Sequence, residues 1–503
     1  MRKIPATMAT QHPDNALPAY WDQHQDPFIS AYQEISEAVH CFDELNVTEY
    51  MWDWEGKHAD AAVIDRLFSE YLDYFKKNQL GKEKFLTFRI PNIWEEKGYN
   101  LLQAMTVILS SEDFARDLKL YKYPLFEVIL PMTESAEQLI HIQKLFRDLS
   151  KFKASHFTPA NKPNYEILQM IPLTESVESQ LKVGQLLQKY LEMYQKEFNT
   201  KPDYIRPFLA RSDPALVSGS LATVIANKLA INQIYEFSDR NNMPVYPISG
   251  VGSLPFRGGL TPDTVKDYIK EYPGMRTVSL QSSFRYDHPV EKVASAVQYL
   301  EKELPKTKPV KIVQKDQKIL KKILKIAKED YQTLLDKILP DVEPIFASVP
   351  RRRDRRQHIG LLAYGRNMGS NKLPRAITYT AGMYSIGIPP ELIGLGQTLS
   401  KLSDEELSTL KKYYLNLDTD TQNAAIYINI LTLNEFAQRG NKAWQEILRG
   451  LDEVSNILGI KIGPQTAEQK RHLALSLELT KTNQKEKQTE LINKMAVIRK
   501  SLG

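Results

Sequence analysis

Short apolar runs that end in polar residues, proline or glycine alternate with amphipathic helical segments along this chain from about Glu83 onward. Segments such as SAEQLIHIQKLFRDLSKF and ESQLKVGQLLQKYLEMYQKEF place apolar residues at helical spacing between the runs. Alternating strands and helices predict a parallel sheet, and about six such units favour its closure into a barrel. We therefore predict an α/β fold built on a TIM-like (β/α)8 barrel with extra helices. The runs read as strands lie within residues 84–92, 123–132, 165–172, 203–213, 244–252 and 276–284.

The rest of the chain is helical in pattern. Residues 302–340 carry eleven lysines and have apolar residues at helical spacing, which predicts an amphipathic helix pair with a lysine-rich solvent side. From Asp404 to Gly503 the pattern is almost continuously helical. We expect residues 1–400 to form an elaborated barrel that carries the functional site, with the 302–340 segment as a helical insertion. Residues 401–503 are expected to form a helical C-terminal region packed on the barrel.

Composition excludes several classes of protein. The net charge of +5 is spread over 66 Lys and Arg and 61 Asp and Glu residues, so no overall field indicates a nucleic-acid-binding protein. A single cysteine, Cys41, excludes an intrachain disulfide and fits a reducing compartment. The segment MRKIPATMATQHPDN lacks the apolar stretch of a signal peptide, and no apolar run reaches the roughly 20 residues of a membrane span. We expect a cytoplasmic protein that binds neither nucleic acid nor membrane.

Carboxylates follow several of the apolar runs. Two near-copies of one phrase, LPMTESAEQL at 130–139 and IPLTESVESQL at 171–181, each put a carboxylate after such a run. Glu175 belongs to the second copy, and Asp213 follows another run in ARSDPA. Carboxylates at strand ends are how a β/α barrel builds a metal site on its rim, so Glu175 and Asp213 are the candidate metal ligands. Glu127 and Glu134 are the next candidates. A role limited to beginning the following helices is the alternative for Glu175 and Asp213.

Arginines and glycines indicate anion binding. Arg257 precedes Gly258 and Gly259 in LPFRGGLTP, where glycines allow close backbone approach and could leave amide donors free for an anion. Residues 351–366 hold six arginines in sixteen positions, and Arg375 follows in KLPRAITYT. Guanidinium groups capture phosphate and carboxylate in a bidentate way. A plain turn for Arg257, and a charged surface loop or nucleic-acid patch for the cluster, are the alternatives.

One histidine stands on a rigid turn. His12 lies in ATQHPDNA, where the next residue is proline and turn-forming side chains follow. Histidine is the side chain that exchanges a proton near neutral pH, so His12 is a candidate base. A structural role is the alternative.

Five motifs together resemble a known family. ATQHPDN, IPLTES, FLARSDPALVSG, GSLPFRGGLTP and LPRAITYTAG occur in this order over most of the chain, and they resemble the motifs of phosphoenolpyruvate carboxylase of the short, archaeal type. The resemblance implies a biotin-free, carbon dioxide-fixing lyase, a cytoplasmic homotetramer on a closed TIM-like barrel, with an anaplerotic role in supplying oxaloacetate. Its substrates would be phosphoenolpyruvate and bicarbonate. Bicarbonate would attack the phosphoryl group to give carboxyphosphate and a metal-stabilised pyruvate enolate, and the enolate would then capture carbon dioxide.

The resemblance also implies residue roles. Glu175 and Asp213 would bind Mg²⁺ or Mn²⁺, and His12 would accept a proton during carboxyphosphate breakdown. Arg257 would retain carboxyphosphate and carbon dioxide, and Arg375 would bind the substrate phosphate. The larger enzymes of the family have a histidine and a further arginine where this loop has Ser249 and Val251, so other arginines would bind the anion here. The candidates for substrate contact are Arg89, Gly258, Gly259, Arg351, Arg352 and Arg353.

Two alternatives stay open. Another Mg²⁺-dependent lyase of the phosphoenolpyruvate and pyruvate barrel group would share Glu175 and Asp213 but would not need His12 on its turn or so many arginines. A basic helical protein that binds nucleic acid could be built on residues 302–356, and its binding should survive physiological salt.

Overall fold

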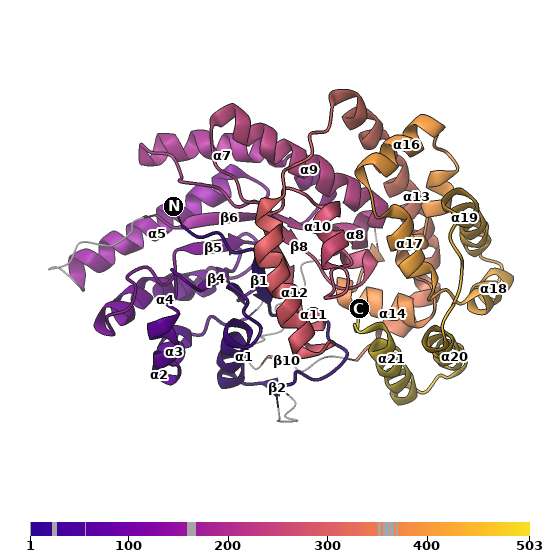
Figure 1. The fold of residues 1–503 in the computed structure, drawn as a ribbon, viewed down its shortest axis with the longest axis horizontal. Coiled ribbons are helices and arrows are strands. Elements are labelled where there is room, and N and C mark those ends of the chain that lie inside the picture. Colours follow the sequence, from indigo (N-terminus) through magenta and orange to yellow (C-terminus); the bar gives the residue numbers. More distant parts are fainter. Residues whose placement is uncertain are drawn as a thin grey trace.

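Eight parallel strands close into a barrel in the order β1-β3-β4-β5-β6-β7-β8-β9 (Figure 1). A computed structural model describes residues 2–22, 28–55, 57–157, 167–350, 354–355, 367–368 and 371–503. The barrel and its surrounding helices confirm the predicted fold class. The strands are β1 (Thr7–Thr10), β3 (Glu49–Asp53), β4 (Phe85–Arg89), β5 (Glu127–Leu130), β6 (Gln169–Thr174), β7 (Phe208–Ala210), β8 (Ile248–Gly250) and β9 (Thr277–Leu280).

Two of these strands, β1 and β3, lie before the region in which the sequence pattern predicts strands. β1 closes the barrel, since it pairs with β9 through Thr7 and Val278 and with β3 through Met8 and Glu49. Because all eight strands are parallel, their carboxyl ends meet at one rim. The remaining described strands are two-residue pairs: β2 (Phe28–Ile29) with β10 (Asp354–Arg355), and β11 (Asn367–Met368) with β12 (Asn371–Lys372).

Helices follow the barrel strands and cover the outside of the sheet (Figure 1). The two copies of the Thr-Glu-Ser phrase each begin a helix in the same way: Ser135 and Ser176 are N-cap residues, each with a capping box. The helices of this part are α1 (Ala31–Asp43), α2 (Val63–Glu70), α3 (Leu72–Lys77), α4 (Gly98–Asp117), α5 (Ala136–His156), α6 (Val177–Gln180), α7 (Val183–Phe198), α8 (Ser212–Ser218), α9 (Ser220–Asn241), α10 (Val265–Glu271), α11 (Ser282–Tyr286) and α12 (Val290–Glu303), with a 3-10 turn η1 (Pro255–Arg257) after β8.

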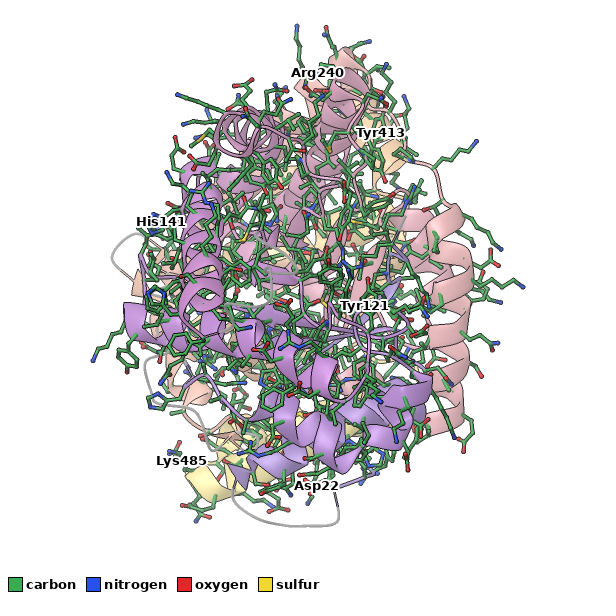
Figure 2. The ribbon with its side chains drawn as sticks, turned by 90° about the vertical axis from the view of Figure 1, so that its left-hand side faces the viewer. Asp22, Tyr121, His141, Arg240, Tyr413 and Lys485 are labelled. Carbon is green, nitrogen blue, oxygen red and sulfur yellow. The ribbon has the colours of Figure 1, made fainter. Side chains whose placement is uncertain are left out.

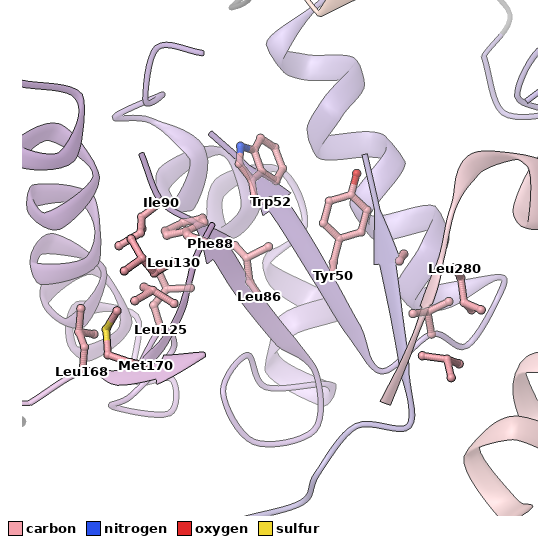
Figure 3. Packing of buried hydrophobic residues seen from close by; sticks show 14 of the residues in the cluster. Tyr50, Trp52, Leu86, Phe88, Ile90, Leu125, Leu130, Leu168, Met170 and Leu280 are labelled. Atoms are coloured by element: carbon pink, nitrogen blue, oxygen red, sulfur yellow. The ribbon is translucent and has the colours of Figure 1, made fainter. Parts of the chain in front are cut away.

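Apolar side chains fill both sides of the barrel wall. Tyr50 and Trp52 of β3 belong to the large core between strands and helices, which Figure 3 shows from close by. The residue between them, Met51, belongs to a smaller cluster with Met8, Phe208 and others. Because neighbouring side chains on a strand point to opposite faces, this smaller cluster fills the interior of the barrel.

A second hydrophobic core joins the helical part of the chain to α8 and α9. The segment predicted as a helix pair forms one long helix, α13 (Gln314–Phe346), preceded by the 3-10 turn η2 (Leu304–Lys306), so the prediction of a pair is wrong. Without a helix-breaking residue between 314 and 339, α13 continues as a single helix, and its apolar stripe packs into this core. The other elements are α14 (Ala376–Ser385), η3 (Pro390–Leu392), α15 (Leu395–Leu399), α16 (Asp404–Tyr413), α17 (Leu417–Ala425), α18 (Ile430–Gln438), α19 (Lys442–Leu458), α20 (Ala467–Lys481) and α21 (Lys485–Arg499), after α13 (Gln314–Phe346).

Exposed lysine side chains of α13 reach the neighbouring helix α16. Lys315 and Lys322 of α13 form ion pairs with Glu405 and Glu406 of α16. In Figure 2 Arg240, near the end of α9, and Lys485, at the start of α21, lie at opposite ends of the view. Helices α16–α21 confirm the helical pattern from residue 404 onward, and the domain division at residue 400 stays a prediction. No helix in the described part of the chain is both long and apolar enough to span a membrane.

Candidate active site

The predicted site residues that follow barrel strands lie at one rim, where the carboxyl ends of the strands meet. Each is brought there by a different strand. They are His12 after β1, Arg89 at the end of β4, Glu175 after β6, Asp213 in the first turn of α8 after β7, and Arg257 after β8.

Glu175 and Asp213 follow neighbouring strands. β6 and β7 pair through Thr174 and Leu209, so the two carboxylates leave the same edge of the sheet. Both residues are half-buried, and Glu175 Oε2 accepts a hydrogen bond of 2.7 Å from the amide of Met132. Among the residues that the structure describes, no group of three or more His, Cys, Asp and Glu side chains could hold a metal ion. Two carboxylates nevertheless fit Mg²⁺, which is bound in proteins by one or two carboxylates and takes its other ligands from water and substrate.

The other two acidic candidates, Glu127 and Glu134, differ from this pair in position or exposure. Glu134, the counterpart of Glu175 in the first Thr-Glu-Ser copy, is exposed, because a turn at 131–132 separates it from the end of β5. Met132 in that turn has a φ of 46°. Glu127 begins β5 at the opposite end of the barrel, where Arg206 donates to it at 2.7 Å. Glu127 is therefore excluded from the rim, and Glu134 differs from Glu175 in being exposed.

Arg257 is held rigidly by its neighbours. Its side chain is 2% exposed, and Nη1 lies 2.9 Å from Asp14 Oδ2. Nη1 also donates to the backbone oxygen of Gly503, Nη2 donates to Gln281, and Nε donates to Ser212 Oγ at 3.1 Å. Ser212 directly precedes Asp213, and Asp14 is two residues from His12. Through these two partners Arg257 connects the segment that carries Asp213 to the segment that carries His12.

The glycines after Arg257 serve the turn itself. Gly258 has a φ of 120°, and a Cβ there would lie 2.7 Å from Val251 Cγ1. The amide of Gly258 donates to Pro255, and the amide of Gly259 donates to Leu254, each at 3.0 Å. The expectation that these amides are free for an anion is wrong, because the tight turn uses them.

His12 is neutral in this environment. Its Nδ1 lies 2.9 Å from Thr10 Oγ1. Burial lowers the pKa of His12 to about 3, and the positive charges of Arg89, Arg257 and Lys57 act in the same direction. The carboxylate of Asp53 opposes them without reversing the shift. The unprotonated imidazole is the form that can accept a proton.

Arg89 belongs to an ion cluster that the sequence pattern did not reveal. Asp53 accepts from Arg89 Nε at 2.8 Å and from Nη2 at 2.6 Å, and Glu55 Oε2 lies 2.6 Å from Nη2. Burial lowers the pKa of Arg89, but Asp53 and Glu55 outweigh it and the pKa is raised, with a contribution from Glu175. Lys57, which is buried, donates to Gln11 at 3.1 Å in the same region. In the sequence, the run EYMWDW is followed by Glu55 and Lys57. This is the same pattern, an apolar run followed by charged residues, that marks the other strand ends.

Of the remaining predicted arginines, the structure describes Arg375. Arg375 is exposed and is the N-cap of α14, a helix that packs against α8. Arg351, Arg352 and Arg353 fall outside the described residues. Substrate contact by these four arginines stays a prediction.

Comparison with known proteins identifies close relatives. A family model described as phosphoenolpyruvate carboxylase matches residues 4–503. The chain is 48% identical over 504 residues to a phosphoenolpyruvate carboxylase of Leuconostoc mesenteroides, covering 100% of this chain and 99% of the relative. It is 46% identical to one of Oenococcus oeni, with the same coverage. It is also 38% identical over 429 residues to one of the archaeon Pyrococcus horikoshii, covering 83% of this chain and 87% of the relative.

Proposed function

The chain belongs to the phosphoenolpyruvate carboxylase family, and on that premise we propose that its barrel rim joins phosphoenolpyruvate to bicarbonate. The products are oxaloacetate and inorganic phosphate. The observation that carries this proposal is the meeting, at one rim, of two carboxylates on neighbouring strand ends, a buried and fixed Arg257, and an unprotonated His12.

The reaction proceeds in two stages. An oxygen of bicarbonate attacks the phosphorus of phosphoenolpyruvate and displaces the enolate of pyruvate, which leaves carboxyphosphate. Carboxyphosphate then breaks into carbon dioxide and phosphate, and C3 of the enolate attacks carbon dioxide to form the new carbon–carbon bond. The proton that bicarbonate brings leaves with the phosphate, so one proton acceptor is sufficient.

His12 supplies that proton acceptor. Its imidazole is unprotonated when the site is empty, because burial and nearby positive charges disfavour the imidazolium. Phosphoenolpyruvate and bicarbonate are anions, and their arrival offsets the charges of Arg89, Arg257 and Lys57. The pKa of His12 therefore rises when substrates bind, and His12 becomes a base at the stage that needs one.

The arginines balance negative charge without giving a proton to the enolate. A guanidinium stays protonated at any working pH, so it cannot quench the carbanion. Arg257, which has its Nη groups fixed by Asp14 and Gln281, retains carboxyphosphate and carbon dioxide beside the enolate. Fixed donors of this kind cost no reorganisation when charge develops.

Glu175 and Asp213 would hold the divalent cation, Mg²⁺ or Mn²⁺. A bound cation supplies positive charge opposite an oxyanion and orients the oxygens around it. The hydrogen bond from Met132 to Glu175 fixes one carboxylate oxygen, and the charge of Glu175 contributes to the raised pKa of Arg89.

Two assays test the proposal. Phosphate release from phosphoenolpyruvate should require bicarbonate, whereas another lyase of the same barrel group would release none in response to it. Glu175→Gln and Asp213→Asn should each abolish metal-dependent turnover with the fold intact, because one carboxylate cannot position the cation alone. Glu134→Gln, at the matching place of the repeated phrase, is the control and should keep parental activity. Parental activity in either rim variant at saturating Mg²⁺ would refute the metal site.

The family resemblance extends the proposal to a homotetramer that works in the cytoplasm. Light scattering on the purified protein measures the assembly directly. A mass of four chains is expected, and a stable monomer with full activity would contradict it.

A further inference from the structure

Glu391 is a buried carboxyl group that reaches from the helical region, here the part of the chain from α13 to α21, to the loop carrying Arg257. It lies in η3, directly after Pro389 and Pro390, and the residue is 8% exposed. Two consecutive prolines fix their own φ angles, so the side chain starts from a rigid backbone.

The carboxyl group makes two hydrogen bonds through one oxygen. Glu391 Oε1 accepts from the amide of Phe256 at 2.5 Å and from the hydroxyl of Tyr384. Within the described part of the chain, Oε2 has no hydrogen-bond partner. A buried amide without an acceptor is costly, so Glu391 fixes the place of the Phe256 backbone.

Phe256 is the residue directly before Arg257, and the helical region holds its side chain as well. The ring is fully buried and lies 5.7 Å, centroid to centroid, from the ring of Tyr379 in α14. The turn around it is tight, since Arg257 donates from its amide to Leu254 and Gly258 donates to Pro255. A shift of the Phe256 amide is therefore passed to the Cα of Arg257.

We propose that Glu391 is a positioning residue for Arg257, and that the helical region sets the place of this arginine through the hydrogen bond from Phe256 to Glu391. The inference rests on the role given to Arg257 in the proposed function. It assigns to the helical region a part in retaining carboxyphosphate and carbon dioxide, although Glu391 itself need not touch either.

The surroundings of Glu391 favour this role over a contribution of charge. The groups that face it are Tyr331 of α13, Tyr379 and Tyr384 of α14, and Arg211 at the start of α8. Burial raises the pKa of Glu391 to about 7, so much of the carboxyl group is protonated near neutral pH. An apolar side chain would avoid this cost of burial, and the gain from the carboxyl group is its acceptor oxygen.

Glu391 can be changed in two matched ways. Glu391→Gln keeps an oxygen acceptor at the same distance from the backbone. Glu391→Asp keeps the carboxyl group but withdraws it by one methylene from the Phe256 amide. Arg257→Gln removes the group that Glu391 is inferred to position.

Oxaloacetate and phosphate are measured in the same sample for these variants and the parent. The ratio of oxaloacetate to phosphate reports how often carboxyphosphate and carbon dioxide are used before they escape, and it does not depend on how much of the sample is folded. We expect a ratio lowered by roughly 10- to 10²-fold in Glu391→Asp, because an ångström-sized misplacement can cost about 10²-fold. Glu391→Gln should keep the parental ratio, and Arg257→Gln should lower it at least as far as Glu391→Asp.

The outcomes separate the inference from the function on which it rests. A lowered ratio in Arg257→Gln with a parental ratio in Glu391→Asp overturns the positioning role and leaves the proposed function standing. A parental ratio in Arg257→Gln overturns the role of Arg257 and the inference together. An equal fall in Glu391→Gln and Glu391→Asp also overturns the inference, because the ionisable group rather than the acceptor would then be required.

Discussion

Replacing His12 by asparagine should uncouple the two stages of the reaction. Asparagine keeps a polar group on the same turn but cannot accept a proton near neutral pH. Neither substrate binding nor attack of bicarbonate on phosphorus needs this base. The variant should therefore release phosphate and pyruvate in a bicarbonate-dependent reaction while making little oxaloacetate.

The size of the effect follows from the site. With the pKa of His12 at about 3, roughly one resting molecule in 10⁴ carries the imidazolium at pH 7. Asparagine thus replaces a neutral group by a neutral group, and KM for phosphoenolpyruvate should change little. Loss of a general base should slow oxaloacetate formation by about 10²–10⁴-fold.

The dependence of folding stability on pH gives a second test of the lowered pKa of His12. Because the pKa of His12 is lowered in the folded state, the unfolded chain binds more protons as the pH falls below 6.5, and the parent loses stability. The Asn variant escapes this loss, which amounts to about 2 kcal/mol at pH 5. The difference in thermal midpoint should therefore shift in favour of the variant between pH 7.5 and pH 5.

The assay follows oxaloacetate, phosphate and thermal midpoints for both proteins, with His141→Asn as the control. His141 is exposed on α5 and is labelled in Figure 2, so its variant should match the parent throughout. Oxaloacetate formed at the parental rate by the His12 variant would refute the role of the base. A stability difference between variant and parent that is the same at pH 7.5 and pH 5 would refute the depressed pKa.

Two further predictions concern the loop and its support. Gly258→Ala should lower the thermal midpoint and the turnover number, because a φ of 120° and a Cβ contact of 2.7 Å should cost about 1–3 kcal/mol of folding stability. Gly259→Ala should have a smaller effect, because the atoms nearest to an added Cβ lie 3.7 Å away. An equal loss in both variants would contradict this prediction. Glu391→Gln should gain thermal stability relative to the parent as pH rises from about 4.5 to 7. The raised pKa of Glu391 means that the unfolded parent releases a proton in this range while the folded parent keeps it, which destabilises the folded parent. A stability difference independent of pH would show that the pKa of Glu391 is not raised.

The sequence predicted the barrel because six apolar runs end in turn residues and alternate with helices. It did not reveal β1, whose four residues TMAT make no apolar run. That strand exists because closure of the barrel pairs it with β3 and β9, a tertiary effect that local propensity does not encode. The strand β3 was not predicted either, so Asp53, which holds Arg89 at the rim, was not recognised as a site residue.

Site residues that directly follow strands could be found from the sequence, as with Glu175 and Asp213. Contacts between distant segments could not. The hydrogen bond from Phe256 to Glu391 joins residues 135 apart in the chain, and no local pattern in IPPELIG indicates its partner. The amides of Gly258 and Gly259 were expected to be free because glycine permits close approach, but the fold uses them to close the turn.

Labelled bicarbonate tests the central claim most directly. The purified protein is incubated with phosphoenolpyruvate, Mg²⁺ and ¹³C-bicarbonate, and oxaloacetate is trapped by reduction and examined by NMR. The account predicts ¹³C in the carboxyl group attached to the former C3 of phosphoenolpyruvate, one phosphate released for each oxaloacetate, and no product when bicarbonate, phosphoenolpyruvate or Mg²⁺ is omitted. Unlabelled product, or phosphate release that is unaffected by removing bicarbonate, would contradict it.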